Sequence, residues 1–469
     1  MENQQQPSTL EKINLKIKNS ITIRLLSIGF LVLILLIPTS MIEDLIRERE
    51  YRRGDVIREV SDKWGGSQTI SGPVLTVPYY VYTKYFDTDD KKDKINKKKV
   101  YAHFLPEHLN IDGDIAPEVR KRSIYKVILY NTNLNVNGTF KKPDFKKLGI
   151  NNKHVLWNEA FVSVGIPDMK GIRDNINLHW NDETYAFNPG IETNDVIASG
   201  VSVKVALQPT ETENELEETS SIDTTKKDIK FSFDLNLNGS SFLNFIPIGK
   251  ETNVNLTSNW AHPSFSGASL PDKHEITADG FTAHWKELHL NRNYPQQWLG
   301  NSHNIGGSSF GVDLLLAVDE YQKSTRSAKY AIMFISFTFL IFFFIEIRNK
   351  KRIHPIQFIL VGLALTIFYA LLLSLSEHIH FNYAYLIAST AIIVMIGAYS
   401  ITIFKNGKLT ALMTGVLILL YGFIFTILQL EDYALLMGSV GLFIVLAIIM
   451  YLSRKIDWYA IAKGKKEIE

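Results

Sequence analysis

Long apolar runs dominate the last quarter of the chain. Each is about as long as the ~20 residues that a helix needs to cross the hydrocarbon of a bilayer. Because lipid offers no partners for backbone N–H and C=O groups, such runs have to be helical. The five runs are Ala328–Ile347, Pro355–Leu375, Tyr383–Phe404, Thr410–Leu430 and Tyr433–Leu452. Residues 328–452 are therefore predicted to form a five-helix transmembrane bundle.

A sixth apolar run, Ile21–Ile42, follows a polar N-terminal stretch of residues 1–20. A cleaved signal peptide is the competing interpretation. The run exceeds the ~7–15 residues usual for a signal core, and no A-x-A-like cleavage site follows it. We therefore expect an uncleaved transmembrane anchor over residues 21–42.

Lysines and arginines of the short loops indicate the orientation of the spans. They cluster in the N-terminal stretch, in alternate connections and in the tail of residues 453–469. The other short loops, Ser376–Asn382 and Glu431–Asp432, contain neither residue. Both termini are therefore expected in the cytoplasm, with residues 43–327 outside it.

The outer region begins with a charged stretch, Glu43–Ser61, that is predicted to continue the anchor as a helix. Acid-before-base pairs four residues apart support a helix, and two of them occur here, Glu43 with Arg47 and Glu48 with Arg52.

Beyond this helix, short alternating or β-branched runs lie between clusters of Gly, Pro, Asn and Ser. The clearest is Tyr125–Phe140. Such a pattern is typical of an antiparallel, all-β, sandwich-like domain. Asp87–Lys99 is predicted to be an exposed loop, and residues 209–227 a polar linker that divides the region into two lobes if there are two.

Composition excludes several classes of function. The formal net charge is only +2, which does not suggest a nucleic-acid-binding protein. There is no cysteine, so the chain has no disulfides and no thiolate metal ligands.

Several stretches resemble the family of the bacterial inner-membrane protein CreD, also described as cell envelope integrity proteins. They are WGGSQTISGPVLTVPY (Trp64–Tyr79), SNWAHPSFSGASLPDKHEITADGFTAHW (Ser258–Trp285), FGVDLLLAVDEYQKSTRSAKYAIMF (Phe310–Phe334) and IHPIQFILVGLALTIFYALLLSLSEHIHF (Ile353–Phe381). The resemblance implies an N-terminal helix, a large periplasmic domain, a C-terminal helix bundle and a link to envelope stress and the β-lactam response. The resemblance implies no catalytic residues. The chain departs from the family mainly at Asp87–Lys99 and Glu211–Glu218.

Two motifs suggest catalysis but lack its context. Gly307–Gly311 fits G-x-S-x-G, yet a strand-like run follows where the nucleophile elbow needs a helix. His274 and Glu275 begin like a zinc-protease helix, but Ala278 stands where the second His should be. We therefore expect neither a hydrolase nor a zinc site.

Polar groups near the ends of the spans are the remaining candidates. Glu377, His378 and His380 are weak candidates for a metal or pH-sensing site, although three ligands rarely suffice and a polar interfacial loop is the alternative. Glu346 is interpreted as an interfacial ion pair with Arg348 and Lys350.

The tryptophans of the outer region could line a carbohydrate site, but they are spread singly along strands and are expected in the core. They are Trp64, Trp157, Trp180, Trp260, Trp285 and Trp298.

Two classes of function remain. In the first, the chain is a non-enzymatic envelope protein without cofactor. Its outer β region binds an unidentified envelope component, and its helices hold that region at the lipid bilayer. In the second, the helix bundle is the active part, as a transporter or lipid-handling protein. The sequence gives no oligomeric state.

Overall fold

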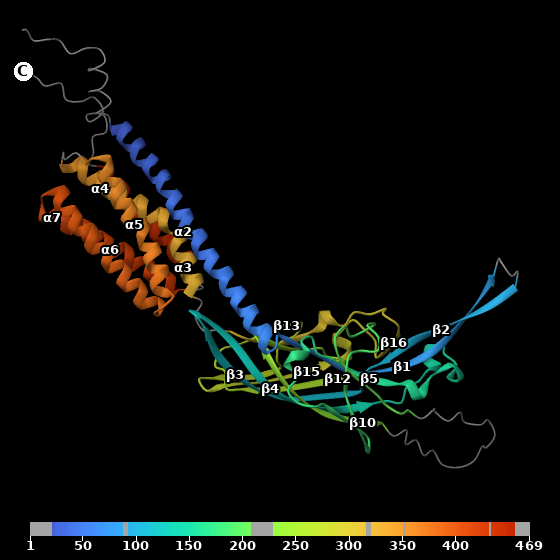
Figure 1. Cartoon of the computed structure of the whole chain (residues 1–469). Coiled ribbons are helices and arrows are strands. Elements are labelled where there is room, and N and C mark those ends of the chain that lie inside the picture. The colour runs from blue at the N-terminus through green and yellow to red at the C-terminus, as the bar shows by residue number, and fades with distance from the viewer. Residues whose placement is uncertain are drawn as a thin grey trace, which may run out of the picture. The chain divides into compact units, whose positions relative to one another are not determined.

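The protein, as a computed structural model, is described over residues 21–87, 92–207, 228–315, 320–349, 353–430 and 433–454 (Figure 1). These residues fall into two compact units. A helical unit is drawn from residues 1–52 and 318–469, and a β unit from residues 53–317. The predicted linker of residues 209–227 lies outside the described residues, so the structure does not test the division into two lobes.

Seven helices are described, and five of them are long and apolar enough to cross a membrane, namely α2 and α4 to α7. A shorter apolar stretch, Leu436–Tyr451, lies within α8. The helices are α2 (Ile21–Trp64), α3 (Glu320–Lys329), α4 (Ala331–Asn349), α5 (Pro355–Ser376), α6 (Phe381–Phe404), α7 (Gly407–Gln429) and α8 (Ala434–Ser453). The prediction of apolar helices on both sides of a β region is confirmed.

The second predicted span begins later than expected, at Ala331 instead of Ala328. A turn at Tyr330 separates it from α3, which is a helix of its own. Because α3 is rich in charged and hydroxyl side chains, the hydrophobic pattern alone did not reveal it.

Helix α2 continues without a break through Gly54 to Trp64, so the predicted charged continuation of the anchor is confirmed. Both predicted ion pairs are present. Arg47 and Glu43 approach to 3.8 Å, and Arg52 and Glu48 to 2.7 Å.

One side of α2 forms a seam against the other helices of its unit. Leu31, Leu35, Thr39 and Ile46 are buried there, four or seven residues apart, as one face of a helix requires. Leu31, Leu35 and Ile46 belong to one hydrophobic cluster with residues of α3 to α7. Leu35 lies against Gly362 of α5, where a β-carbon built on the glycine would approach its Cδ1 to 2.1 Å.

The β unit consists of two sheets of nine and eight strands. The first has the order β13 (Pro263–Gly267), β17 (Phe310–Leu314), β11 (Phe242–Phe245), β1 (Gln68–Asp87), β5 (Phe161–Gly165), β9 (Gly200–Lys204) and β8 (Asn188–Pro189), with β2 (Lys92–Phe104) on β1 and β16 (Gln297–Leu299) on β2. The second has the order β14 (Lys273–Thr277), β15 (Gly280–Leu288), β12 (Glu251–Ser258), β3 (His108–Arg122), β4 (Tyr125–Phe140), β10 (Ile229–Ser240), β6 (Asn177–Trp180) and β7 (Glu183–Ala186).

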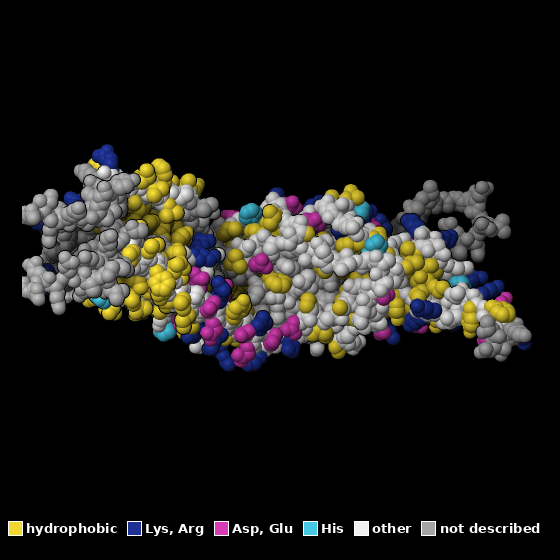
Figure 2. All heavy atoms as spheres, turned by 90° about the horizontal axis from the view of Figure 1, so that it is seen from above, with side chains coloured by type: hydrophobic (Ala, Val, Ile, Leu, Met, Phe, Trp, Pro, Cys, Tyr) yellow, Lys and Arg dark blue, Asp and Glu magenta, His cyan; other side chains and the backbone are white. Residues whose placement is uncertain are grey.

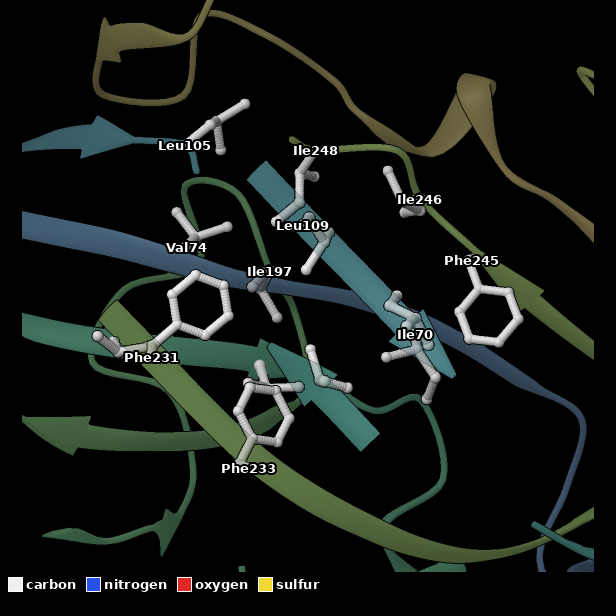
Figure 3. Packing of buried hydrophobic residues seen from close by; sticks show 14 of the residues in the cluster. Ile70, Val74, Leu105, Leu109, Ile197, Phe231, Phe233, Phe245, Ile246 and Ile248 are labelled. Atoms are coloured by element: carbon white, nitrogen blue, oxygen red, sulfur yellow. The ribbon is translucent and has the colours of Figure 1, made fainter. Parts of the chain in front are cut away.

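Alternating side chains of the two sheets build the core. In β10, Phe231, Phe233, Leu235 and Leu237 are buried while the residues between them are not. Figure 3 shows side chains from β1 of the first sheet and β10 of the second meeting in this core. The pairing is mostly antiparallel, as predicted, but β1 with β11 and β3 with β12 pair in parallel.

The predicted loop Asp87–Lys99 is wrong. β1 runs to Asp87, β2 begins at Lys92, and the two pair in register from Asp87 opposite Lys92 to Leu75 opposite Phe104. We call residues 80–87 and 92–99 the hairpin arm. Its side chains are exposed on both faces, so its sequence lacks the apolar alternation that marks a strand lying on a core.

Candidate functional site

The predicted cluster Glu377, His378 and His380 lies between α5 and α6, where these groups serve the helix ends. Glu377 is the C-cap of α5, and its Oε1 lies 3.6 Å from Nε of Arg49 on α2. His380 is the N-cap of α6, and its Nδ1 accepts a hydrogen bond from the Asn382 N–H at 3.4 Å. Within the described ranges, no three His, Asp or Glu residues come together as metal ligands.

The structure gives Glu346 a partner that the sequence did not indicate. Its Oε1 forms an ion pair with Nη1 of Arg24 on α2 at 2.9 Å, and only 5% of its side chain is exposed. Arg348, two residues further on, is exposed because it points to another side of α4, and Lys350 lies outside the described residues. The carboxylate therefore joins the first helix to the bundle.

The motifs set aside in the sequence have structural roles. Gly306–Ser308 is a short turn that leads into strand β17, so the nucleophile-elbow geometry is missing. His274 and Glu275 lie on a strand, β14, and not on a helix. Four of the six tryptophans are buried in the core and the other two are partly buried: Trp157, Trp180, Trp285 and Trp298, then Trp64 and Trp260.

A buried polar group that the sequence did not reveal lies in the first sheet. His103 of β2 is 1% exposed, and its Nδ1 lies 3.0 Å from the hydroxyl of Thr76 on β1. Its Nε2 lies 3.4 Å from a carboxylate oxygen of Asp195. Since a carboxylate only accepts, Nε2–H donates to Asp195 and Nδ1 accepts from Thr76. Burial lowers the pKa of His103 despite the opposing effect of Asp195.

Hydroxyl, imidazole and carboxylate together resemble a catalytic constellation, but the space beside them is too small for a substrate. The adjoining cavity has a volume of about 10 Å³, with Thr76, His103 and Ser163 among its lining residues. That is room for about one water molecule. Because these residues are far apart in the chain and come from three elements, no spacing motif could have indicated them. We interpret the group as a structural buried network.

A second electrostatic cluster connects three segments of the second sheet. Glu107 lies 2.9 Å from Nζ of Lys141 and 3.3 Å from Nζ of Lys250. Burial alone would raise the pKa of Glu107, but the hydrogen bonds and charges of the two ammonium groups lower it. The cluster lies at the start of β3, where the backbone also pairs with the segments around Thr139 and Glu251.

The hairpin arm carries most of the exposed large apolar side chains of the first sheet. On it, Phe86 is 61% exposed and Ile95 62%, and Val81, Tyr82 and Tyr85 are also exposed. Residues opposite one another in an antiparallel pair share a face, so Tyr82 lies beside Lys97 and Ile95 beside Lys84. Figure 2 shows hydrophobic and basic side chains intermixed at the end of the β unit where the arm lies.

A cavity of about 530 Å³ lies in the helical unit between α2 and α3. Its lining combines both signs of charge with an aromatic ring: Glu43, Ile46, Arg47, Glu50, Tyr51, Thr325 and Lys329. Such a lining suits a small zwitterionic group better than an apolar one.

Comparison with known proteins agrees with this architecture. Residues 20–459 match the family model described as "Inner membrane protein CreD". The chain is similar to the inner membrane protein CreD of Escherichia coli (strain K12), with 33% identity over 446 residues, which cover 93% of this chain and 94% of that protein. With one apolar helix before the β unit and several after it, this chain belongs to the CreD family of inner membrane proteins.

Proposed function

We propose that this inner-membrane protein is not an enzyme and supports the integrity of the cell envelope under stress, by binding an envelope component with its β region outside the cytoplasm. The observation that carries the proposal is the hairpin arm. It leaves large apolar side chains in water although the same unit buries its core almost completely. Contiguous exposed apolar groups usually mark an interaction surface.

The proposed topology has both termini in the cytoplasm and residues 43–327 in the periplasm. It is supported by the short connections between the spans, of which only alternate ones contain Lys or Arg. On this topology, the arm and the outer part of α2 face the periplasm. The proposal of a non-enzymatic role is supported by the small volume of the cavity beside His103, about 10 Å³, which has no room for a substrate.

A complementation test addresses the proposal. The full chain carrying Tyr82→Ser, Phe86→Ser and Ile95→Ser is expressed in a strain that lacks the protein, and detergent and β-lactam sensitivity are scored. We expect loss of rescue at normal membrane abundance. Since these side chains are exposed, the fold should persist, which Trp fluorescence checks. A matched control with Leu270→Ser and Leu290→Ser removes exposed apolar groups elsewhere in the β unit and should rescue. Full rescue by the arm variant would refute the proposed role of the arm.

The cavity between α2 and α3 favours a second function, in which the helical unit handles lipid or a transported solute. Its charged lining lies on a helix that continues from the apolar anchor. If this second function is the right one, the double variant Arg47→Gln with Lys329→Gln should fail to rescue the strain. The arm variant should then still rescue it. The opposite pattern favours the first proposal.

A further inference from the structure

We propose that the hairpin arm binds the surface of an anionic phospholipid bilayer. This inference rests on the proposed function and names the chemistry of the component bound by the β region. The arm offers both apolar side chains and a local excess of positive charge, which together match a lipid surface.

The backbone of the arm has only its own two strands. β5 pairs with β1 from Ser71 to Thr76, before the arm begins, and β16 pairs with β2 from Ala102 to Phe104, after the arm ends. A two-stranded ribbon is at best marginally stable in water and gains from burial against a partner. The described arm is therefore a protruding element. The ring of Tyr82 contacts His154, with 4.9 Å between the ring centroids, while Phe86 and Ile95 further out are 61% and 62% exposed.

The arm is strongly basic. Residues 80–87 and 92–99 contain six lysines and two aspartates, a net charge of +4, whereas the whole chain has a net charge of +2. Lys84 and Lys98 are exposed and lie on opposite faces, since they pair with Ile95 and Val81. Positive charge of this density attracts an anionic surface over about a Debye length.

Aromatic, apolar and basic side chains are interleaved along the arm. Tyr80 and Tyr82 lie near its base, with Nζ of Lys97 at 3.6 Å from the centre of the Tyr80 ring. Further out, Ile95 lies opposite Lys84, and Tyr85 opposite Lys94. Tyrosine and lysine are favoured at headgroup depth, while phenylalanine and isoleucine enter the acyl boundary.

Other partners fit this composition less well. Protein interfaces are depleted of lysine, so six lysines on one short hairpin are unusual for a protein-binding surface. A neutral glycan would gain nothing from the charge. The chain is also held at a membrane by its own helices, so a bilayer is present at high effective concentration.

Two bilayers could supply this surface: the one that holds the helices and one that faces it. Because the chain has no cysteine, Asn96→Cys places a single environment-sensitive fluorophore on the arm of the full-length protein. The protein is reconstituted in nanodiscs of phosphatidylcholine or of phosphatidylcholine with phosphatidylglycerol. Vesicles of either composition are then added to the phosphatidylcholine discs.

We expect a blue shift only with phosphatidylglycerol, reversed by high salt. A shift in anionic discs alone identifies the anchoring bilayer, and a shift with anionic vesicles identifies a facing bilayer. Lys84→Gln with Lys98→Gln should weaken the affinity of the arm for the phosphatidylglycerol-containing surface by about tenfold or more. The control, Lys146→Gln with Lys147→Gln, removes two exposed lysines outside the arm and should leave it unchanged. The absence of a shift in every mixture overturns the inference.

The two proposals fail in distinguishable ways. One outcome is that phosphatidylglycerol causes no shift in the unsubstituted protein, while the variant with serine at Tyr82, Phe86 and Ile95 fails to rescue the strain. The lipid inference is then wrong, and the arm binds another envelope component. If that variant rescues fully, the arm is not the functional surface, whatever it binds in vitro.

Discussion

Leu35 of α2 fills the space in front of Gly362 of α5, and any side chain at position 362 would take that space away. A β-carbon there would also meet the ring of Phe339 at 2.9 Å. The contact lies in the middle of the seam that holds the first helix to the bundle.

We predict that Gly362→Leu destabilises the helical unit by about 1–3 kcal/mol, because overpacking forces neighbours out of place. Gly362→Ala is a poorer test, since the higher helix propensity of alanine offsets part of the stability lost through the clash. Thermal unfolding in detergent, followed by the helical circular dichroism signal, measures the effect. Adding Leu35→Ala should recover part of it. Gly415→Leu is the control, because nothing lies within 4 Å of a β-carbon there.

The Arg24–Glu346 ion pair is predicted to stabilise the same docking. Either Arg24→Gln or Glu346→Gln should cost about 1–3 kcal/mol, since each removes a charge-assisted hydrogen bond from a partly buried site. The double variant should cost less than the sum of the two, which a double-mutant cycle reveals. Arg348→Gln removes an exposed charge from α4 and should change stability by under about 0.5 kcal/mol. Additive effects would contradict the pairing.

His103 should make the β unit sensitive to mild acid. Its pKa is lowered in the fold by burial, so between the unfolded value of about 6.5 and the folded value only the unfolded chain takes up the proton. This contribution to stability is complete above pH ~6.5 and falls as the pH drops toward the folded pKa.

Trp fluorescence can follow unfolding of the β unit, because six of the seven tryptophans lie in it. The midpoint of the unsubstituted protein should fall more steeply below neutral pH than that of His103→Gln. Exchanging the exposed His262 for Gln should not change the slope. Equal slopes for the protein and His103→Gln would show that the imidazole titrates as it does in the unfolded chain.

Glu107 should make the stability of the β unit depend on pH in a more acidic range than His103 does. The pKa of this carboxyl is depressed, on balance, by Lys141 and Lys250, so its contribution is present above the unfolded value of about 4.3 and is lost as the pH falls through the folded value. Glu107→Gln should lower the unfolding midpoint at neutral pH and flatten its decline in acid. If the variant and the parent protein decline in parallel, the two lysines do not hold this carboxylate ionised.

The sequence was most informative where burial of one face makes apolar residues recur at regular spacing. Long apolar runs predicted the spanning helices, and the i,i+4 pairs Glu43–Arg47 and Glu48–Arg52 predicted the continuation of α2. Tyr125–Phe140 is a strand with these bounds. In each case neighbours in sequence are neighbours in space, so a local pattern suffices.

It was least informative where partners are distant or water lies on both faces. Arg24 and Glu346 are brought together only by helix packing, so the nearer bases were assigned to the carboxylate instead. Asp195, in the connection between β8 and β9, reaches His103 of β2 from 92 positions away, without a motif. The hairpin arm was taken for a loop because no core selects one face of it.

The separation of Arg24 and Glu346 by 322 positions has a consequence for biosynthesis. At about 5–20 residues per second, the ribosome needs on the order of 16–65 s to add the acidic partner after the arginine. During this interval the first helix has to persist in the bilayer by itself, with Leu31, Leu35 and Thr39 facing lipid. Its own hydrophobic length must therefore hold it there, and the seam closes only once the later helices have been inserted.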